Sequence, residues 1–211
     1  SVVNMLKVGV IGVGHLGQHH ARIYSKLDGV ELVGVADIVV ERAEQAAADY
    51  GGRAVRDFRS LLADVDAFSI AVPTEEHATI GRECLEYGID LLVEKPIAPS
   101  IDEARSLIEC ARNNDRILQV GHVERFNPVV LAAQGIATQP QFFEVHRLSV
   151  FSMRSLDIDV VLDLMIHDID IVLSLVDSEV SEIRAVGIPV LSDKADIANA
   201  RIEFEDGCVA N

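Results

Sequence analysis

The first 121 residues alternate between short apolar runs and longer stretches with helical periodicity. An apolar run of this kind, bounded by turn residues, is typical of a buried strand. The apolar runs lie at residues 7–11, 30–36, 54–55 (the weakest), 67–72, 90–93 and 117–120. The helical stretches lie between them, at residues 15–27, 39–50, 74–87 and 101–113. This alternation predicts an α/β fold, a doubly wound parallel sheet with helices on both faces.

The pattern changes after Gly121. Residues Glu124 to Pro128 break the alternation, and strand patterns then outnumber helical ones. This half predicts a C-terminal α/β domain with an open, mostly antiparallel sheet, so we divide the chain into domains 1–121 and 122–211. The elements expected in the second domain are helices at 128–135 and 157–176 and strands at 141–148, 182–190 and 197–204.

The end of the chain has the pattern of a hairpin. Residues 197–204 alternate like a strand, Glu205-Asp206-Gly207 has the composition of a tight turn, and only four residues follow it. An arm of four residues is too short to complete a sheet edge. We therefore expect the chain to be a fragment whose sheet is truncated.

The first apolar run leads directly into three glycines, Gly12, Gly14 and Gly17, spaced G-x-G-x-x-G. Between a strand and a helix, the first glycine permits the tight turn and the second lets a pyrophosphate approach the backbone. The third lets the helix pack close to the sheet. The helix N-terminus then offers unpaired N–H groups to the phosphates. The alternative is a glycine-rich turn without a ligand.

Asp37 strengthens the ligand interpretation. It follows Gly17 by twenty positions and ends the second apolar run, where a carboxylate would bind the hydroxyls of an adenosine ribose. The loop and the acid together predict a dinucleotide site. A carboxylate there repels a 2′-phosphate and no arginine follows it directly, so we expect NAD in preference to NADP.

Two further motifs follow predicted strands at the carboxyl edge, where ligands bind in such sheets. Lys95, in Glu94-Lys95-Pro96, would hydrogen-bond a substrate hydroxyl and stabilise a developing alkoxide. The alternative is an ordinary solvated lysine. Thr74 follows Pro73 and is expected to cap the next helix, near a nicotinamide and His77. The turn at Pro96 is compatible with a cis peptide bond.

The long helix expected at 157–176 is apolar around most of its circumference, which predicts burial. Within an arc of about 80°, at 100° per residue, lie its polar residues Asp159, Asp163, His167, Asp170 and Ser174. Such a stripe predicts a wet cavity, with His167 as a candidate base and Asp163 as its orienting carboxylate. The alternatives are a stripe that faces solvent or another subunit, and a metal site, which lacks an obvious third ligand.

Arg147 and Arg154 flank the loop before this helix. Two arginines beside a cleft would hold a phosphate or a carboxylate. Ordinary surface arginines, or partners for Asp157 and Asp159, explain them equally well.

Composition narrows the class of protein. Eighteen basic and 34 acidic residues give a net charge of −16, which disfavours a nucleic-acid partner. The three cysteines fit neither a disulfide framework nor a zinc site, so we expect reduced core thiols in a cytoplasmic protein. No uncharged apolar run reaches the length of a membrane span.

The combination of GVGHLG, Asp37, AVPTEEH, LLVEKP, GHVERFNP and DLMIHD resembles the glucose–fructose oxidoreductase / inositol dehydrogenase / MocA (Gfo/Idh/MocA) family over essentially the whole chain. The resemblance implies an N-terminal Rossmann domain that binds NAD or NADP. It also implies a C-terminal domain whose open sheet commonly packs against other subunits, here in a homodimer or homotetramer. Members are usually longer than 211 residues, so we expect later strands to be missing.

The resemblance also assigns roles to motif residues. It implies that Lys95 contacts the reacting hydroxyl and that Asp163 and His167 complete the site, with His167 as the base. We predict substrate contacts at Arg125, Asn127, Arg147 and Arg154. We predict cofactor contacts at Gly12, Gly14, His15, Leu16, Gly17, Asp37, Val72, Pro73, Thr74, His77, Glu94, Lys95 and Pro96.

Within the family, the segments VGHVERFNP, HRLS and DVVLDLMIHDIDIVLSLV are most similar to enzymes that act on nucleotide sugars. We therefore predict an NAD-dependent dehydrogenase of a secondary alcohol on a sugar, with a nucleotide sugar such as UDP-N-acetylglucosamine as substrate. The alternatives are a dehydrogenase of a free sugar or inositol, and a non-catalytic member that binds cofactor or sugar.

Overall fold

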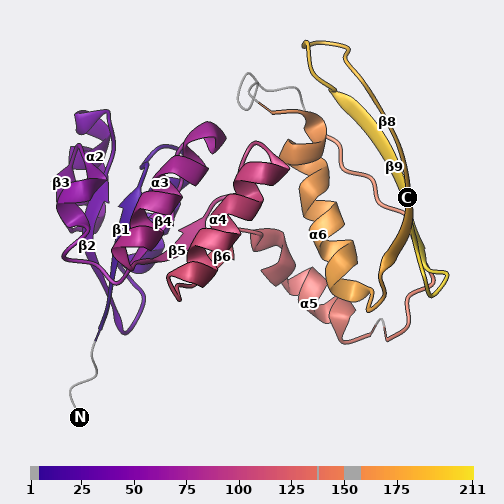
Figure 1. Ribbon diagram of the computed structural model, residues 1–211, viewed down its shortest axis with the longest axis horizontal. Helices are drawn as coiled ribbons and strands as arrows, with labels where there is room; N and C mark the ends of the chain where they lie inside the picture. Colours follow the sequence, from indigo (N-terminus) through magenta and orange to yellow (C-terminus); the bar gives the residue numbers. More distant parts are fainter. Residues whose placement is uncertain (1–4, 137, 150–157) are drawn as a thin grey trace. The chain divides into compact units, whose positions relative to one another are not determined.

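The computed structural model describes residues 5–136, 138–149 and 158–211. The chain divides into two compact units, Ser1–Gly121 and His122–Asn211 (Figure 1). None of the helices within the described ranges has the length and apolar content that a membrane span requires.

The first unit contains a six-stranded parallel sheet with the strand order β3-β2-β1-β4-β5-β6. The strand order runs in one direction from β1 to β3 and in the other from β4 to β6. The switch point of the doubly wound sheet therefore lies between the carboxyl ends of β1 and β4. The predicted α/β fold is therefore confirmed. The strands are β1 (Leu6–Ile11), β2 (Val30–Ala36), β3 (Arg53–Val55), β4 (Ala67–Ile70), β5 (Asp90–Val93) and β6 (Leu118–Val120). The helices are α1 (Gly17–Tyr24), α2 (Val40–Tyr50), the 3-10 helix η1 (Phe58–Leu61), α3 (Thr74–Tyr87) and α4 (Ile101–Asn113).

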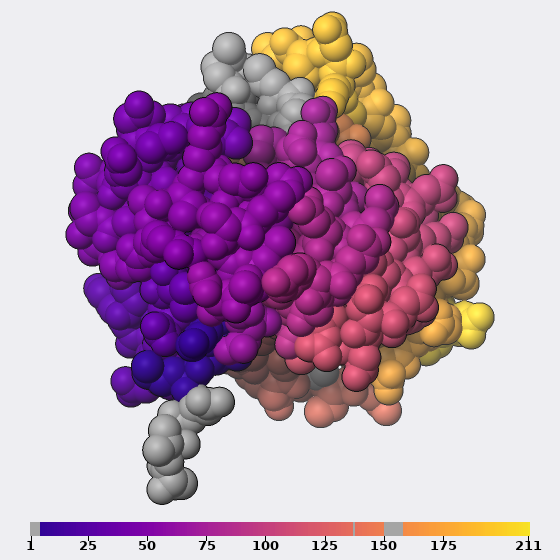
Figure 2. Space-filling model, turned by 60° about the vertical axis from the view of Figure 1, so that its left-hand side comes forward, coloured from indigo at the N-terminus to yellow at the C-terminus, as the bar shows by residue number. Residues whose placement is uncertain are grey.

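Each face of this sheet has its own apolar core, because successive side chains of a buried strand point to opposite faces. One core joins β1 and β2 to helices α1 and α2, through Val10, Val35 and Ala43 among others. The other core joins β4 and β5 to α3 and α4, around Phe68 and Leu107. Helices α3 and α4 lie side by side, and their side chains form one continuous surface (Figure 2).

The second unit packs helices on a mixed, mostly antiparallel sheet with the strand order β7-β10-β9-β8. Its apolar core joins Val172 and Val176 to the sheet residues Ile202 and Phe204. The strands are β7 (Phe142–Phe143), β8 (Val180–Ile188), β9 (Ile197–Phe204) and β10 (Val209–Ala210). The helices are the 3-10 helix η2 (Val123–Phe126), α5 (Pro128–Gln134), the π-helix η3 (Val161–Met165) and α6 (Ile166–Leu175).

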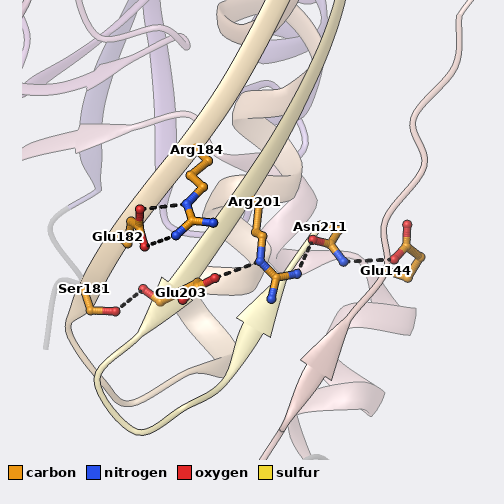
Figure 3. Close-up of polar contacts among 7 residues, drawn as sticks. All are labelled: Glu144, Ser181, Glu182, Arg184, Arg201, Glu203 and Asn211. Atoms are coloured by element: carbon orange, nitrogen blue, oxygen red, sulfur yellow. Dashed lines mark hydrogen bonds and ion pairs between the residues drawn. The ribbon is translucent and has the colours of Figure 1, made fainter.

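Ion pairs connect neighbours along the same strand on one face of this sheet (Figure 3). Glu182 pairs with Arg184 on β8 at 2.7 Å, and Arg201 pairs with Glu203 on β9 at 2.8 Å. The loop between the two strands closes on Asp196. One oxygen of its carboxylate accepts the backbone N–H groups of residues 190, 191 and 192.

Several expectations about these elements and about the cysteines are wrong in extent or in burial. The strand expected at 141–148 is only Phe142–Phe143, because its parallel partner β10 has only two residues. The helix expected at 157–176 contains a π-helical segment and has its described helical residues from 160, with residues 150–157 outside the described ranges. That helix is mostly half-buried rather than buried. Among the cysteines, Cys84 and Cys208 are buried as expected, whereas Cys110 is only partly buried.

The Phe68→Ala variant tests the larger core of the first unit. Phe68 is 1 % exposed and its ring meets that of Phe58 edge-on. Loss of the ring should lower the free energy of unfolding by about 3–5 kcal/mol. Urea unfolding followed by circular dichroism measures this, with Phe142→Ala, 58 % exposed in the wild type, as the matched control. Equal losses in the two variants would show that Phe68 is not a core anchor.

Candidate active site

The glycine loop between β1 and α1 places different demands on its three glycines. Gly12 has a φ of +82°, and a Cβ there would lie 2.8 Å from the carbonyl oxygen of Ala71. A Cβ at Gly17 would lie 1.7 Å from the carbonyl oxygen of Gly12. A Cβ at Gly14 would meet no atom within 4 Å. The fold itself therefore requires glycine at 12 and 17, whereas the space at Gly14 is left open by the protein.

Asp37 connects the glycine loop to the end of β2. Its buried carboxylate accepts the N–H of Val13 at 3.0 Å through one oxygen and the N–H of Val39 at 2.9 Å through the other. A carboxylate offers about four acceptor positions, so positions remain for ribose hydroxyls. His15 and Leu16, in the turn that precedes α1, have exposed side chains on the same loop.

The loop after β4 differs from the expectation in one respect. Thr74 does not cap α3: Pro73, with φ −55° and ψ 144°, occupies the N-cap, so Thr74 is the first helical residue and is buried. His77 follows one turn later and is 1 % exposed. Its Nδ1 lies 2.9 Å from the carbonyl oxygen of Pro96, and its Nε2 lies 2.9 Å from that of Val72.

The Glu94-Lys95-Pro96 turn follows β5 at the same carboxyl edge, since β5 pairs in parallel with β4. Its Lys95–Pro96 peptide bond is cis. Glu94 is buried, and its carboxylate accepts a hydrogen bond from His20 of α1 at 2.8 Å. Lys95 is half-buried. The structure thus brings the predicted cofactor residues of the first unit to one edge of its sheet.

In the second unit, Asp163 lies in the π-helix η3 and His167 in the first turn of α6. Both are half-buried. π-helical segments are rare and occur frequently at functional sites. A cavity of about 110 Å³ lies within this unit, lined by Asp168, Arg147 and residues of β9 and β10. Neither Asp163 nor His167 lines it, so this cavity is not the one that the polar stripe predicted.

Other polar residues of the stripe have structural partners. Asp159 accepts the N–H groups of residues 161 and 162 at 3.0 Å and so caps η3. Asp170 is buried and binds the guanidinium of Arg125 through both carboxylate oxygens. These hydrogen bonds raise the pKa of Arg125 and keep it charged. The Arg125–Asp170 pair joins residues 45 positions apart, and the sequence reasoning missed it.

Of the remaining predicted substrate residues, two have structural partners within the protein and one lies outside the described residues. Asn127 caps α5 by accepting the N–H of Val129 at 3.0 Å. Arg147 binds Asp168 through three hydrogen bonds of 2.7–3.0 Å. Asp157, one of the partners considered for it, lies outside the described residues. Arg154 lies outside the described residues. Within the described ranges, no group of three or more histidine, cysteine or carboxylate side chains is arranged to hold a metal.

Comparison with known proteins places this arrangement in a family. Residues 6–122 match the sequence model of the Gfo/Idh/MocA oxidoreductase family, described as having an NAD-binding Rossmann fold. The chain belongs to this family. The family resemblance of the sequence motifs is therefore confirmed.

Individual relatives are consistent with this membership. The UDP-N-acetylglucosamine 3-dehydrogenase of Acidithiobacillus ferrooxidans is 42 % identical over 98 % of this chain and 66 % of its own length. Its solved structure superposes with a TM-score of 0.91 over 98 % of this chain and 68 % of that one. The inositol 2-dehydrogenase of Rubrobacter xylanophilus is 33 % identical, over 87 % of this chain and 56 % of its own. An NAD-binding protein from Listeria innocua is 26 % identical, with a TM-score of 0.86 over 97 % of this chain and 65 % of its own. The chain thus spans about two thirds, or less, of the length of these relatives.

The residues of the first unit fit a dinucleotide. The open space at Gly14 lets a pyrophosphate approach the backbone, and α1 begins three residues later with its N–H groups toward the loop. Asp37 is fixed at the end of β2 with acceptor positions to spare. The open space at Gly14 is the feature that a bound pyrophosphate needs, whereas Gly12 and Gly17 are required by the backbone of the turn with or without a ligand.

Alanine substitutions separate the two kinds of glycine. Gly17→Ala should lower the free energy of unfolding by about 1–3 kcal/mol, because its Cβ collides with backbone. Gly14→Ala should leave stability within about 0.5 kcal/mol of the wild type, yet weaken NAD binding at least tenfold. Thermal unfolding and calorimetric titration with NAD measure the two effects. If Gly14→Ala binds NAD as tightly as the wild type does, the loop does not approach the pyrophosphate at Gly14.

Proposed function

We propose that the protein is an NAD-dependent dehydrogenase that oxidises a secondary alcohol of a nucleotide sugar, or reduces the corresponding ketone. The observation that carries the reaction class is the shared sheet edge: the glycine loop, Asp37 and the Glu94-Lys95-Pro96 turn all follow the carboxyl ends of parallel strands. In this fold that edge binds the cofactor along its length. We assign Lys95 to the nicotinamide end of this edge.

The residues that follow β1 and β2 are assigned to the adenosine half of the cofactor, and those that follow β4 and β5 to its nicotinamide half. The loop around Gly14, with His15 and Leu16, receives the pyrophosphate, and Asp37 receives the adenosine ribose. Because the carboxylate of Asp37 repels a 2′-phosphate, NAD binds in preference to NADP. Val72, Pro73, His77 and the Glu94–Pro96 turn form the segment assigned to the nicotinamide end.

The proposed catalytic residues are Lys95, Asp163 and His167. Bound NAD supplies an acceptor for the hydride of the carbinol carbon. Lys95 donates a hydrogen bond to the substrate oxygen and stabilises the alkoxide as it develops. His167 takes the hydroxyl proton, since imidazole titrates near neutral pH. Asp163, four positions earlier, orients His167.

The nucleotide-sugar substrate is supported by the 42 % identity to a UDP-N-acetylglucosamine 3-dehydrogenase. Arg125 and Arg147 remain proposed substrate contacts, but each already binds an aspartate. A substrate phosphate would therefore bind the guanidinium N–H groups that do not contact the aspartate. The 33 % identity to an inositol 2-dehydrogenase favours a polyol as the second candidate substrate.

A substrate panel tests the proposal. UDP-N-acetylglucosamine, free N-acetylglucosamine and myo-inositol are each incubated with NAD and with NADP while nicotinamide absorbance is followed. We expect kcat/KM to be highest for the nucleotide sugar and at least about tenfold higher with NAD than with NADP. Preference for inositol would select the second candidate. Binding of NAD without turnover of any substrate would favour a non-catalytic member of the family.

The His167→Ala variant tests the base. Removal of a general base should lower kcat by about 10²–10⁴-fold while the Kd for NAD changes less than about twofold. His146→Ala is the matched control, since the His146 side chain is 75 % exposed. Stopped-flow absorbance gives the rates and calorimetry the affinities. Full turnover in the variant would rule out the base assignment.

A further inference from the structure

A buried carboxylate precedes the proposed catalytic lysine. Glu94 is 7 % exposed, and its Oε1 accepts a hydrogen bond from Nε2 of His20 at 2.8 Å. Its other oxygen accepts the backbone N–H of Lys95 itself, at 3.3 Å. A Cβ at Gly121 would lie 3.2 Å from this carboxylate, so the glycine at the end of the unit leaves room for it. Glu94 thus connects the backbone of the lysine to His20.

His20 is held in turn by a chain of hydroxyls. Its Nδ1 lies 3.1 Å from the hydroxyl of Ser69 on β4, and that hydroxyl lies 2.6 Å from the hydroxyl of Tyr24. Because an ionised carboxylate only accepts, the proton of a neutral His20 lies on Nε2 and its Nδ1 accepts from Ser69. Ser69 then accepts from Tyr24. Burial raises the pKa of Tyr24, which keeps it protonated and able to donate.

A second histidine holds the residue after the lysine. His77 of α3 is 1 % exposed, and its Nδ1 lies 2.9 Å from the carbonyl oxygen of Pro96. Its Nε2 lies 2.9 Å from the carbonyl oxygen of Val72, in the loop after β4. A neutral imidazole has one N–H to donate and an imidazolium has two. Both partners of His77 are carbonyl acceptors, so its ring lies between the loop after β4 and the lysine turn, and a neutral ring donates to one of the two.

We propose that His20 and His77 are positioning residues for Lys95. They hold Glu94 and Pro96, the residues on either side of the lysine, from two different helices. This rests on the proposed role of Lys95 and extends it: the direction of the lysine is set by contacts of its two neighbours. Displacement of a catalytic group by about 1 Å can lower a rate about 10²-fold, so loss of either histidine should affect turnover more than cofactor binding.

Substitution of a histidine by asparagine or glutamine separates the roles of its two ring nitrogens. The side-chain amide of asparagine lies near the position of Nδ1, and that of glutamine lies near the position of Nε2. His20→Gln retains a donor to Glu94, whereas His20→Asn does not. For His77 the order reverses, since the atom that meets Pro96 is Nδ1. We expect kcat to fall about 10–100-fold in H20N and H77Q, to stay within about threefold of the wild type in H20Q, and to fall less in H77N than in H77Q. The Kd for NAD and the melting temperature should change little in H20N and H20Q.

A mutant cycle shows whether the effect passes through the lysine. In a Lys95→Ala background, single-turnover measurements should show no further loss of rate from H20N or H77Q. An equal loss with and without Lys95, or equal rates for the asparagine and glutamine variants at either histidine, would overturn the proposal.

Amide hydrogen exchange provides a readout that needs no substrate. The N–H of Lys95 should exchange at least about tenfold faster in H20N than in the wild type or H20Q, with the core strands unchanged. Unchanged exchange at Lys95 would overturn the role of His20 even if every variant were active. If the wild type oxidises no substrate, the proposed function fails, and the exchange pattern still decides whether His20 holds the turn.

Discussion

The close approach of helix α1 to the turn after β1 is the constraint on which the first unit depends. Only a glycine fits at position 17, where a Cβ would lie 1.7 Å from the carbonyl oxygen of Gly12. The helix can therefore begin directly at the sheet edge. Three residues further along, His20 reaches both Ser69 of β4 and Glu94 after β5. One backbone contact thus places the dinucleotide loop and also brings the lysine turn within reach of the same helix.

The sequence predicted the first unit well because its signals are local. Helices α3 and α4 begin and end at the predicted residues. Gly88 ends α3 in the left-handed conformation, and Ser100 starts α4 by accepting the N–H of Glu103. The exception, Thr74, has an equally local cause. A proline before a helix can take the N-cap conformation itself, and the residue types alone did not decide between the two positions.

The candidate site in the second unit was less predictable because its partners lie far apart in sequence. The periodicity predicted one helix for Asp163 and His167, which lie in η3 and α6, yet nothing in it indicated the π-helical segment between Val161 and Met165. Nor could periodicity reveal that Arg125 binds Asp170 or that Arg147 binds Asp168. Such pairs are decided by tertiary packing, so arginines that looked available for a substrate are already bound within the protein.

The ion pairs on the second sheet have a consequence for strand register. Arg184 lies directly opposite Arg201, and Glu182 lies opposite Glu203, so like charges face one another across β8 and β9. Like charges directly opposite destabilise a strand pair. A slip of two residues would keep the same side chains on each face and place Arg184 opposite Glu203. The loop that closes on Asp196 opposes this slip, because loop geometry fixes the register of a hairpin. The loop therefore fixes the alignment of these two strands even though like charges face one another directly across them.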